Sequence, residues 1–183
     1  MKRVAIIGSN GFIGKSIIEN IQNPSIEFTQ FIRKKSNFLP KISNCRFIDL
    51  KSIKAESLAN IDVVILCASE TNPASNLKDY SLEIEKNINP HILFFNELIK
   101  SDVRDIIYLS SGGAVYGNSK KSKISEDHPT KPKNPYGYGK LCIELAIQSI
   151  FAGSDKRFTI LRPSNPVGVH QLKSLGTHGL VRT

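Results

Sequence analysis

The sequence predicts an α/β fold, a doubly wound parallel sheet with helices on both faces. Short β-branched runs alternate with longer segments of helical period, which is the pattern of parallel strands joined by helical crossovers. A glycine-rich turn follows the first run and precedes the first helical segment. The 183 residues suffice for one hydrophobic core and fall short of two ordinary full-sized domains, so we expect one principal domain.

Six runs are predicted to be strands because they are short, rich in β-branched or aromatic residues and separated by turn residues. They are Val4–Ile7, Phe28–Ile32, Arg46–Ile48, Val63–Cys67, Ile106–Ser110 and Phe158–Leu161. Because crossovers between parallel strands are right-handed, the doubly wound order is the simplest topology for these runs.

Two helices are predicted between the earlier strands. The first presents one apolar face, made of Phe12, Ile13, Ile17, Ile18 and Ile21. The second spans Ser81–Lys100, and its apolar stripe consists of Ile84, Ile88, Ile92, Phe95 and Ile99. Pro90 removes a backbone donor in the middle of this helix, so we expect a bend near Asn89.

A third helix is expected from about Pro135 to Phe151. Proline is favoured in the first turn of a helix, and Gly153 marks the end of this one. The residues expected to face the core are Leu141, Leu145, Ala146 and Ile150. After Arg162 no periodic pattern continues, because prolines and glycines interrupt it at Pro163, Pro166, Gly168 and Gly176.

The formal net charge of +9 would suit nucleic acid, an anionic membrane surface or a phosphorylated small molecule. Basic residues concentrate at Arg33–Lys35 and between Lys120 and Lys133. Aromatic residues do not alternate with them as they do in proteins that stack on bases. We therefore expect a solvated basic surface and no nucleic-acid partner.

The first residues, Met1–Ile7, begin like a signal peptide, but Gly8 ends the apolar run well short of the required length. No segment approaches about 18 consecutive apolar residues. We expect no membrane insertion and a cytoplasmic location. The three cysteines lack CxxC spacing and the four histidines lack paired ligand spacing, so no metal site is expected.

The stretch "GSNGFIGKS", Gly8–Ser16, carries three glycines at a spacing of three, between a strand and an amphipathic helix. In that setting Gly8 permits the sharp turn, Gly11 lets the backbone approach a pyrophosphate, and Gly14 allows close packing of helix on strand. We expect a dinucleotide to be held here by Gly8, Asn10, Gly11, Phe12, Ile13 and Gly14. The alternative is a turn with no ligand.

Four further stretches accompany this turn: "LCAS" after the fourth strand, "SSGGAVYG" at Ser110–Gly117, "PYGYGK" at Pro135–Lys140 and "LRPSNPVG" at Leu161–Gly168. Together they resemble the extended short-chain dehydrogenase/reductase superfamily, in particular the NAD(P)-dependent epimerase/dehydratase family typified by UDP-glucose 4-epimerase. The resemblance implies a dinucleotide-binding Rossmann domain over residues 1–162. Residues 163–183 would begin a substrate-binding lobe, most of which the chain would lack, or form an irregular tail.

The second half of the expected cofactor site has a basic residue, Arg33, where dinucleotide folds often have an acid for the adenosine ribose. Since a basic residue accommodates a 2′-phosphate, we favour NADP over NAD. A solvated basic turn is the alternative, and the family contains NAD users without the acid. The resemblance further implies that Asp49 and Leu50 contact the adenine, although Asp49 also suits a helix N-cap.

The same resemblance assigns three more residues to the cofactor site. Ala68 is small where the backbone passes the cofactor, and Pro163 contacts the cofactor. Asn87 resembles the helix-borne asparagine that supports the active site, with an ordinary exposed asparagine as the alternative.

Tyr136 and Lys140 are four residues apart and share one helix face. A tyrosine has an ordinary pKa of about 10, and a nearby ammonium stabilises its phenolate, so the pair suits proton transfer. The pair also occurs by chance, but Tyr138 is out of phase with Lys140 whereas Tyr136 matches the family pattern in register. By resemblance Tyr136 and Lys140 also contact the cofactor, Lys140 at the nicotinamide ribose.

The third catalytic partner is predicted to be Ser111, which would also bind substrate. The family usually has Ser or Thr where this chain has Gly112, so Ser110, the backbone or water are alternatives. Asn165 resembles the asparagine that contacts the substrate's diphosphate or sugar, and a turn residue is the alternative.

The resemblance implies an NAD(P)-dependent epimerase or 4-keto reductase acting on a nucleotide-diphosphate sugar, with a UDP-sugar favoured, for surface polysaccharide precursors. Dehydration is disfavoured because Gly112–Ala114 stands where the related dehydratases carry Thr-Asp-Glu. The alternatives are a non-catalytic NAD(P)-binding or redox-sensing module and an inactive truncated fragment. A homodimer formed by two helices from each subunit is also expected from the resemblance.

Overall fold

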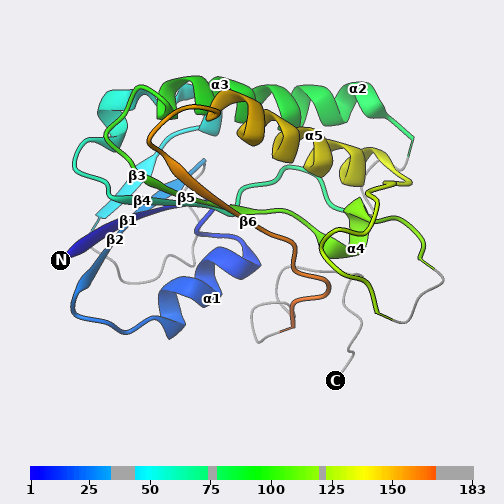
Figure 1. Ribbon diagram of the computed structural model, residues 1–183. Coiled ribbons are helices and arrows are strands. Elements are labelled where there is room, and N and C mark those ends of the chain that lie inside the picture. The colour runs from blue at the N-terminus through cyan, green and yellow to red at the C-terminus, as the bar shows by residue number, and fades with distance from the viewer. Residues whose placement is uncertain (34–43, 74–77, 120–122, 168–183) are drawn as a thin grey trace.

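A computed structural model describes residues 1–33, 44–73, 78–119 and 123–167 of the chain. Its sheet has six parallel strands, in the order β3-β2-β1-β4-β5-β6 (Figure 1). They are β1 (Lys2–Ile7), β2 (Ile26–Ile32), β3 (Asn44–Phe47), β4 (Val63–Leu66), β5 (Asp105–Leu109) and β6 (Arg157–Leu161). This order reverses between β1 and β4, which confirms the doubly wound parallel sheet.

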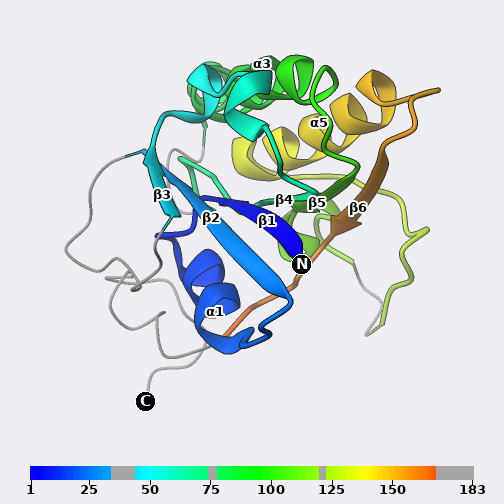
Figure 2. The ribbon, with the colours of Figure 1, turned by 90° about the vertical axis from the view of Figure 1, so that its left-hand side faces the viewer.

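Helices cover both faces of the sheet, as predicted. One face carries α1 (Phe12–Asn20), and the other carries the helices that connect β4 to β5 and β5 to β6 (Figures 1 and 2). These are α2 (Tyr80–Glu83), η3 (Ile84–Ile88), α3 (Asn89–Leu98) and α5 (Pro135–Ile150). Three short helical turns complete the described part of the chain: η1 (Leu50–Ser52), η2 (Ala55–Leu58) and α4 (Gly112–Val115).

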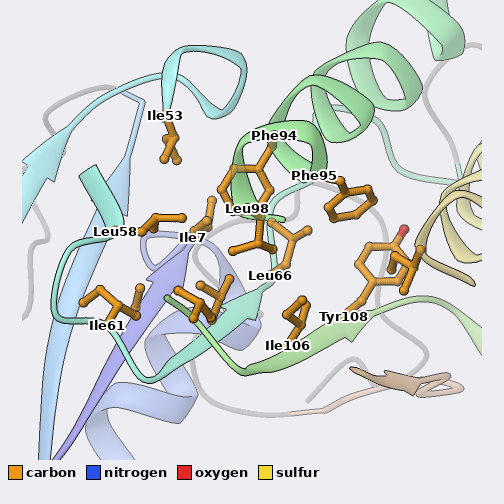
Figure 3. Packing of buried hydrophobic residues seen from close by; sticks show 14 of the residues in the cluster. Ile7, Ile53, Leu58, Ile61, Leu66, Phe94, Phe95, Leu98, Ile106 and Tyr108 are labelled. Carbon is orange, nitrogen blue, oxygen red and sulfur yellow. The ribbon is translucent and has the colours of Figure 1, made fainter. Parts of the chain in front are cut away.

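The hydrophobic core lies mainly between the sheet and α3. Phe94, Phe95 and Leu98 of α3 pack toward Leu66 and Tyr108 of the central strands (Figure 3). A smaller cluster on the opposite face joins Val4, Ile6 and Ile18 beneath α1. Successive residues of β1 serve the two clusters alternately because side chains alternate along a strand. The sheet is therefore fixed from both sides at β1, where the glycine turn begins.

The predicted helix Ser81–Lys100 is divided by a π-helical turn, η3, in which the amide of Asn89 donates to the carbonyl of Ile84. Pro90 lies just after this turn, at the start of α3, where a missing N–H costs least. The predicted apolar stripe was wrong at Ile84, whose side chain is exposed. The buried line instead carries Glu83, Asn87 and His91.

In α5 the predicted inward position of Leu145 was also wrong. Leu145 is 55% exposed, whereas Lys140, Ile143, Glu144 and Ile147 are buried. Their spacing of three and four residues is that of one helix face, and two of them are charged. The core side of α5 therefore follows residues that a hydrophobic pattern does not select.

Most of the predicted second unit, residues 163–183, lies outside the described residues, including Gly168 of the last motif. Lys34 and Lys35 of the first basic group also lie outside them. In the described part of the chain, no helix has the length and apolar composition needed to span a membrane.

Candidate functional site

The glycine turn lies where β1 ends and α1 begins. Gly8 has a φ of +84°, and a Cβ there would lie 2.7 Å from the backbone nitrogen of Ala68. A Cβ on Gly14 would lie 2.5 Å from the carbonyl oxygen of Gly8. For Gly11 that distance is 3.2 Å, so Gly11 is the least enclosed of the three glycines. The N-cap residue of α1, Gly11, has no side chain, so it caps no amide of the first turn, an arrangement that suits an anion.

A cavity of about 380 Å³ opens at the carboxyl ends of β1, β2 and β4. It lies at the point where the strand order reverses, which is where open α/β sheets bind their ligands. Eight of the predicted cofactor residues line it: Gly8, Asn10, Gly11, Arg33, Asp49, Leu50, Ala68 and Asn87. Phe12, Ile13 and Gly14 form the first turn of α1 and are not part of the lining.

The far corner of this cavity contains an ion pair. Arg33 follows β2 directly, and its guanidinium contacts the carboxylate of Glu70 from the loop after β4. Asp49 precedes η1, but its side chain does not cap that helical turn, so the N-cap alternative does not account for it. Asp49 is among the residues that line the cavity.

Asn87 is buried and connects the cavity to the interior. Its Oδ1 accepts from the amide of Glu70 at 2.9 Å, and its Nδ2 donates to Thr71 Oγ1 at 2.6 Å and to Glu83 Oε1 at 3.0 Å. Thr71 Oγ1 in turn donates to Glu83 Oε2 at 2.6 Å. The exposed-asparagine alternative is therefore wrong, and Asn87 fixes the loop that carries Glu70.

Lys140 is buried in α5, and its Nζ donates to the carbonyl oxygen of Leu109 at 2.9 Å. Burial lowers the pKa of Lys140 to about 8, while the negative charges of Glu83 and Glu144 act against this lowering. Gly139 leaves room for Glu83, since a Cβ at position 139 would overlap its carboxylate. The ammonium is thus held between the end of β5 and two buried carboxylates.

Tyr136 lies beside Lys140, whose Nζ is 5.8 Å from the centre of the Tyr136 ring. Burial raises the pKa of Tyr136, and a hydrogen bond with the Ser111 side chain acts in the opposite direction. The structure brings Tyr136, Lys140 and Ser111 together. Lys140 lies toward the Tyr136 ring, and the influences on the phenol pKa are burial, Ser111 and Glu83, so the predicted lowering of this pKa by the ammonium is not what the structure shows. Ser110, the alternative hydroxyl, donates instead to the buried carboxylate of Glu144.

Gly112, which stands where the resemblance implies serine or threonine, has little room for a side chain. A Cβ at Gly112 would lie 2.6 Å from the carbonyl oxygen of Arg162, and the amide of Gly112 donates to the carbonyl oxygen of Pro163 at 2.9 Å. The backbone near Pro163 therefore occupies the space that a serine would need. Asn165 is exposed two residues later and is not part of the cavity lining.

Sequence reasoning missed three polar residues of this region, Glu70, Glu83 and His91. His91 is buried, and its Nδ1 donates to the carbonyl oxygen of Asn87 at 2.6 Å. The sequence contains a signal for two of them, because Glu83 and His91 recur with Asn87 every four residues and so share one helix face. Within the described ranges, no three His, Cys, Asp or Glu residues lie together so as to hold a metal ion.

Comparison with known proteins identifies the family of this chain. The model of the NAD dependent epimerase/dehydratase family matches residues 4–181. The chain belongs to this family. Among its relatives is the dTDP-4-dehydro-6-deoxyglucose reductase of Escherichia coli, 32% identical over 180 residues, which cover 92% of this chain and 57% of the relative. A putative UDP-glucose 4-epimerase of Methanocaldococcus jannaschii is 29% identical, with the same coverage of both chains.

Solved structures show the same fold. The UDP-glucose 4-epimerase of Thermotoga maritima with UDP-glucose superposes on this chain with a TM-score of 0.81, at 22% identity, over 92% of this chain and 57% of that one. The Thermus thermophilus UDP-glucose 4-epimerase in complex with NAD gives a TM-score of 0.76, at 23% identity, over 87% and 54% of the two chains. The chain thus spans a little over half the length of the relatives it matches.

Proposed function

We propose that this chain is the coenzyme-binding and catalytic part of an NAD(P)-dependent nucleotide-sugar epimerase or 4-keto reductase, with a UDP-sugar as substrate. The observation that carries the proposal is the meeting of Tyr136, Lys140 and Ser111. None of the three lines the cavity, but Lys140 acts electrostatically on Cys67 and His91, which do. The named activities of the relatives support a nucleotide-sugar substrate. We place the reaction in the synthesis of surface polysaccharide precursors.

The residues present fit a dinucleotide. Gly11 lines the cavity, and little backbone surrounds the position of its missing side chain, so the chain there can approach a pyrophosphate. The first turn of α1 supplies amides and positive potential for its charge. Arg33 supports NADP as the coenzyme only as far as its guanidinium is available, and it is paired with Glu70.

A bound nicotinamide would accept hydride from a sugar carbon and return it. In this reaction Tyr136 takes the proton of the hydroxyl on the same carbon and gives it back when the ketone is reduced. Ser111 donates a hydrogen bond to the sugar oxygen beside Tyr136, and Lys140 holds a positive charge next to the phenol ring. Asn165, two residues after Pro163, is assigned to the diphosphate or sugar.

The decisive experiment replaces Tyr136 by phenylalanine and compares the variant with the parent chain. We expect turnover of UDP-glucose or of a 4-keto nucleotide sugar to fall about 100-fold or more, because the proton acceptor is lost. Binding of NADH or NADPH, followed by fluorescence titration, should stay within about threefold because the glycine turn is unchanged. Unchanged turnover in the Tyr136→Phe variant would refute the catalytic assignment. Coenzyme binding without any turnover in the parent would support the non-catalytic alternative.

We also propose that the protein forms a homodimer through its outer helices. Exposed apolar side chains lie on α3 and α5, at Leu93 and Leu145, and Tyr80 and Tyr138 contact each other edge to face at 5.4 Å. A second copy would bury this surface, since large exposed apolar side chains gathered on adjacent helices are typical of protein interfaces.

A further inference from the structure

The adenosine corner of the cavity is defined by two charged residues from different strands. Arg33 stands at the end of β2, the position that reads the adenosine ribose in dinucleotide folds. Glu70 comes from the loop after β4, and its carboxylate pairs with the Arg33 guanidinium. Both residues line the cavity. An acid is therefore present at this corner, although it does not come from the strand where the sequence pattern looks for it.

The loop that carries Glu70 is held in place by hydrogen bonds to buried side chains of the helices that follow it. The Glu70 amide donates to the buried Asn87, and the next residue, Thr71, is bonded to the buried Glu83. Ser69 Oγ also donates to the carbonyl oxygen of Thr71 at 2.9 Å. Because both neighbours of the Glu70 side chain are anchored, its carboxylate stays within reach of Arg33.

The formal charges of the described residues that line the cavity sum to zero. Among the described residues that line the cavity, Arg33 and Lys86 are positive, and Asp49 and Glu70 are negative. A 2′-phosphate carries more than one negative charge and would meet an arginine that is already neutralised. A ribose with a free 2′-hydroxyl has no such charge and can donate to a carboxylate.

We propose that Glu70 sets the coenzyme preference of this chain, by pairing with Arg33 and disfavouring the 2′-phosphate of NADP. The proposal rests on the proposed function, since it assumes that the cavity holds a nicotinamide dinucleotide. It explains how a chain with arginine at the β2 end can still use NAD. The preference for NADP that was inferred from Arg33 assumes an arginine that is not paired with a carboxylate, whereas Arg33 is paired with Glu70.

The test is equilibrium titration of the purified chain with NADH and with NADPH, in parallel. Replacing Glu70 by glutamine removes the charge and keeps the size of the side chain. We expect the ratio of NADPH to NADH affinity to rise about three- to tenfold, because Arg33 is released and a like charge is removed from the phosphate. Higher salt should shrink this gain, since the corner is partly exposed.

Glu56→Gln is the matched control. Glu56 is an exposed acid of η2 that does not line the cavity, so its loss should leave the ratio within about twofold. In the double variant Arg33→Gln/Glu70→Gln most of the gain should disappear, because the released arginine is absent. Thermal unfolding of every variant shows whether it folds.

The outcomes separate the two proposals. If both coenzymes bind and Glu70→Gln leaves their affinity ratio unchanged, or Glu56→Gln shifts it equally, the role of Glu70 is refuted and the proposed function stands. If neither coenzyme binds to the folded parent chain, the proposed function fails, and the role of Glu70 fails with it.

Discussion

Lys140 shows how this protein keeps a charge in its interior. The ammonium donates to a strand carbonyl, faces the rings of Tyr108 and Tyr136, and lies in the field of Glu83 and Glu144. Glu144 is itself paired with Arg162, and Glu83 is bonded to Thr71 and Asn87. Buried charges are tolerated when they are paired and hydrogen-bonded in this way.

His91 gives a residue-level test of this interior. Burial, followed by the positive charge of Lys140, lowers the pKa of His91 to about 4 from its ordinary 6.5. Below pH 6.5 the unfolded chain therefore takes up a proton that the folded protein refuses until about pH 4. The free energy of unfolding should fall across this window, by about 3 kcal/mol at most.

The measurement compares the parent chain with His91→Gln in urea denaturation at several pH values. The stability of the parent relative to this variant should decline between pH 7 and pH 4. Glu83, whose pKa is raised by burial, has the opposite pH dependence, but it is present in both proteins and cancels in the difference. A difference that is constant over this range would show that His91 is not excluded from protonation.

At the scale of elements, the glycines of the turn have different structural roles. Gly14 packs α1 against the turn, because any Cβ there would press on the backbone of Gly8 and Ser9. Gly11 lines the cavity and meets only the Gly8 carbonyl at 3.2 Å. Stability should therefore depend on Gly14 and coenzyme binding on Gly11.

A pair of alanine substitutions tests this division. Gly14→Ala should destabilise the chain by about 1–3 kcal/mol, since the added methyl group has no room. Gly11→Ala should unfold close to the parent temperature and bind NADH about tenfold or more weakly, because its methyl group projects toward the pyrophosphate. Thermal unfolding and fluorescence titration of both variants decide the matter. Equal loss of coenzyme affinity at equal stability would contradict it.

The helices also show what could be read from the sequence. Strand positions and helix existence follow from period and turn residues, so six strands and three helical segments were predictable. The orientation of α5 and of the helix before it was not, because Lys140, Glu144, Glu83 and Asn87 occupy buried lines. Lysine and glutamate are rarely buried without partners, and these partners come from distant parts of the chain. Tyr136 and Lys140 could be named beforehand because they are four residues apart and because Tyr136 matches the family pattern in register.

At the scale of the molecule, the proposed catalytic residues and the candidate coenzyme cavity both lie toward the carboxyl ends of the parallel strands. Tyr136 and Ser111 follow β5 along the chain, and the cavity lies at the ends of β1, β2 and β4. The outer surfaces of α3 and α5 then remain for association. The proposed dimer uses a different surface from the one that binds coenzyme.

The dimer is tested by replacing Leu145, which is 55% exposed on α5, by glutamate. We expect the parent to have the mass of two chains of 20.3 kDa in light scattering, and Leu145→Glu to shift toward one chain because a charge cannot be buried in an apolar interface. Gln22→Glu, at an exposed polar position just after α1 on the opposite face of the sheet, is the control. A parent that scatters as a single chain at every concentration would exclude the dimer.

The π-helical turn of η3 has a consequence for how this segment tolerates change. One residue adds about 100° of rotation around a helix axis, so the wide turn sets the angle at which Glu83 meets Gly139 relative to the core face of α3. Point substitutions on its solvent side leave that angle alone. A one-residue deletion within Ile84–Ile88 would leave a segment that still forms a helix, but it would rotate the Glu83 carboxylate out to water. In this segment the number of residues is therefore under tighter constraint than their types.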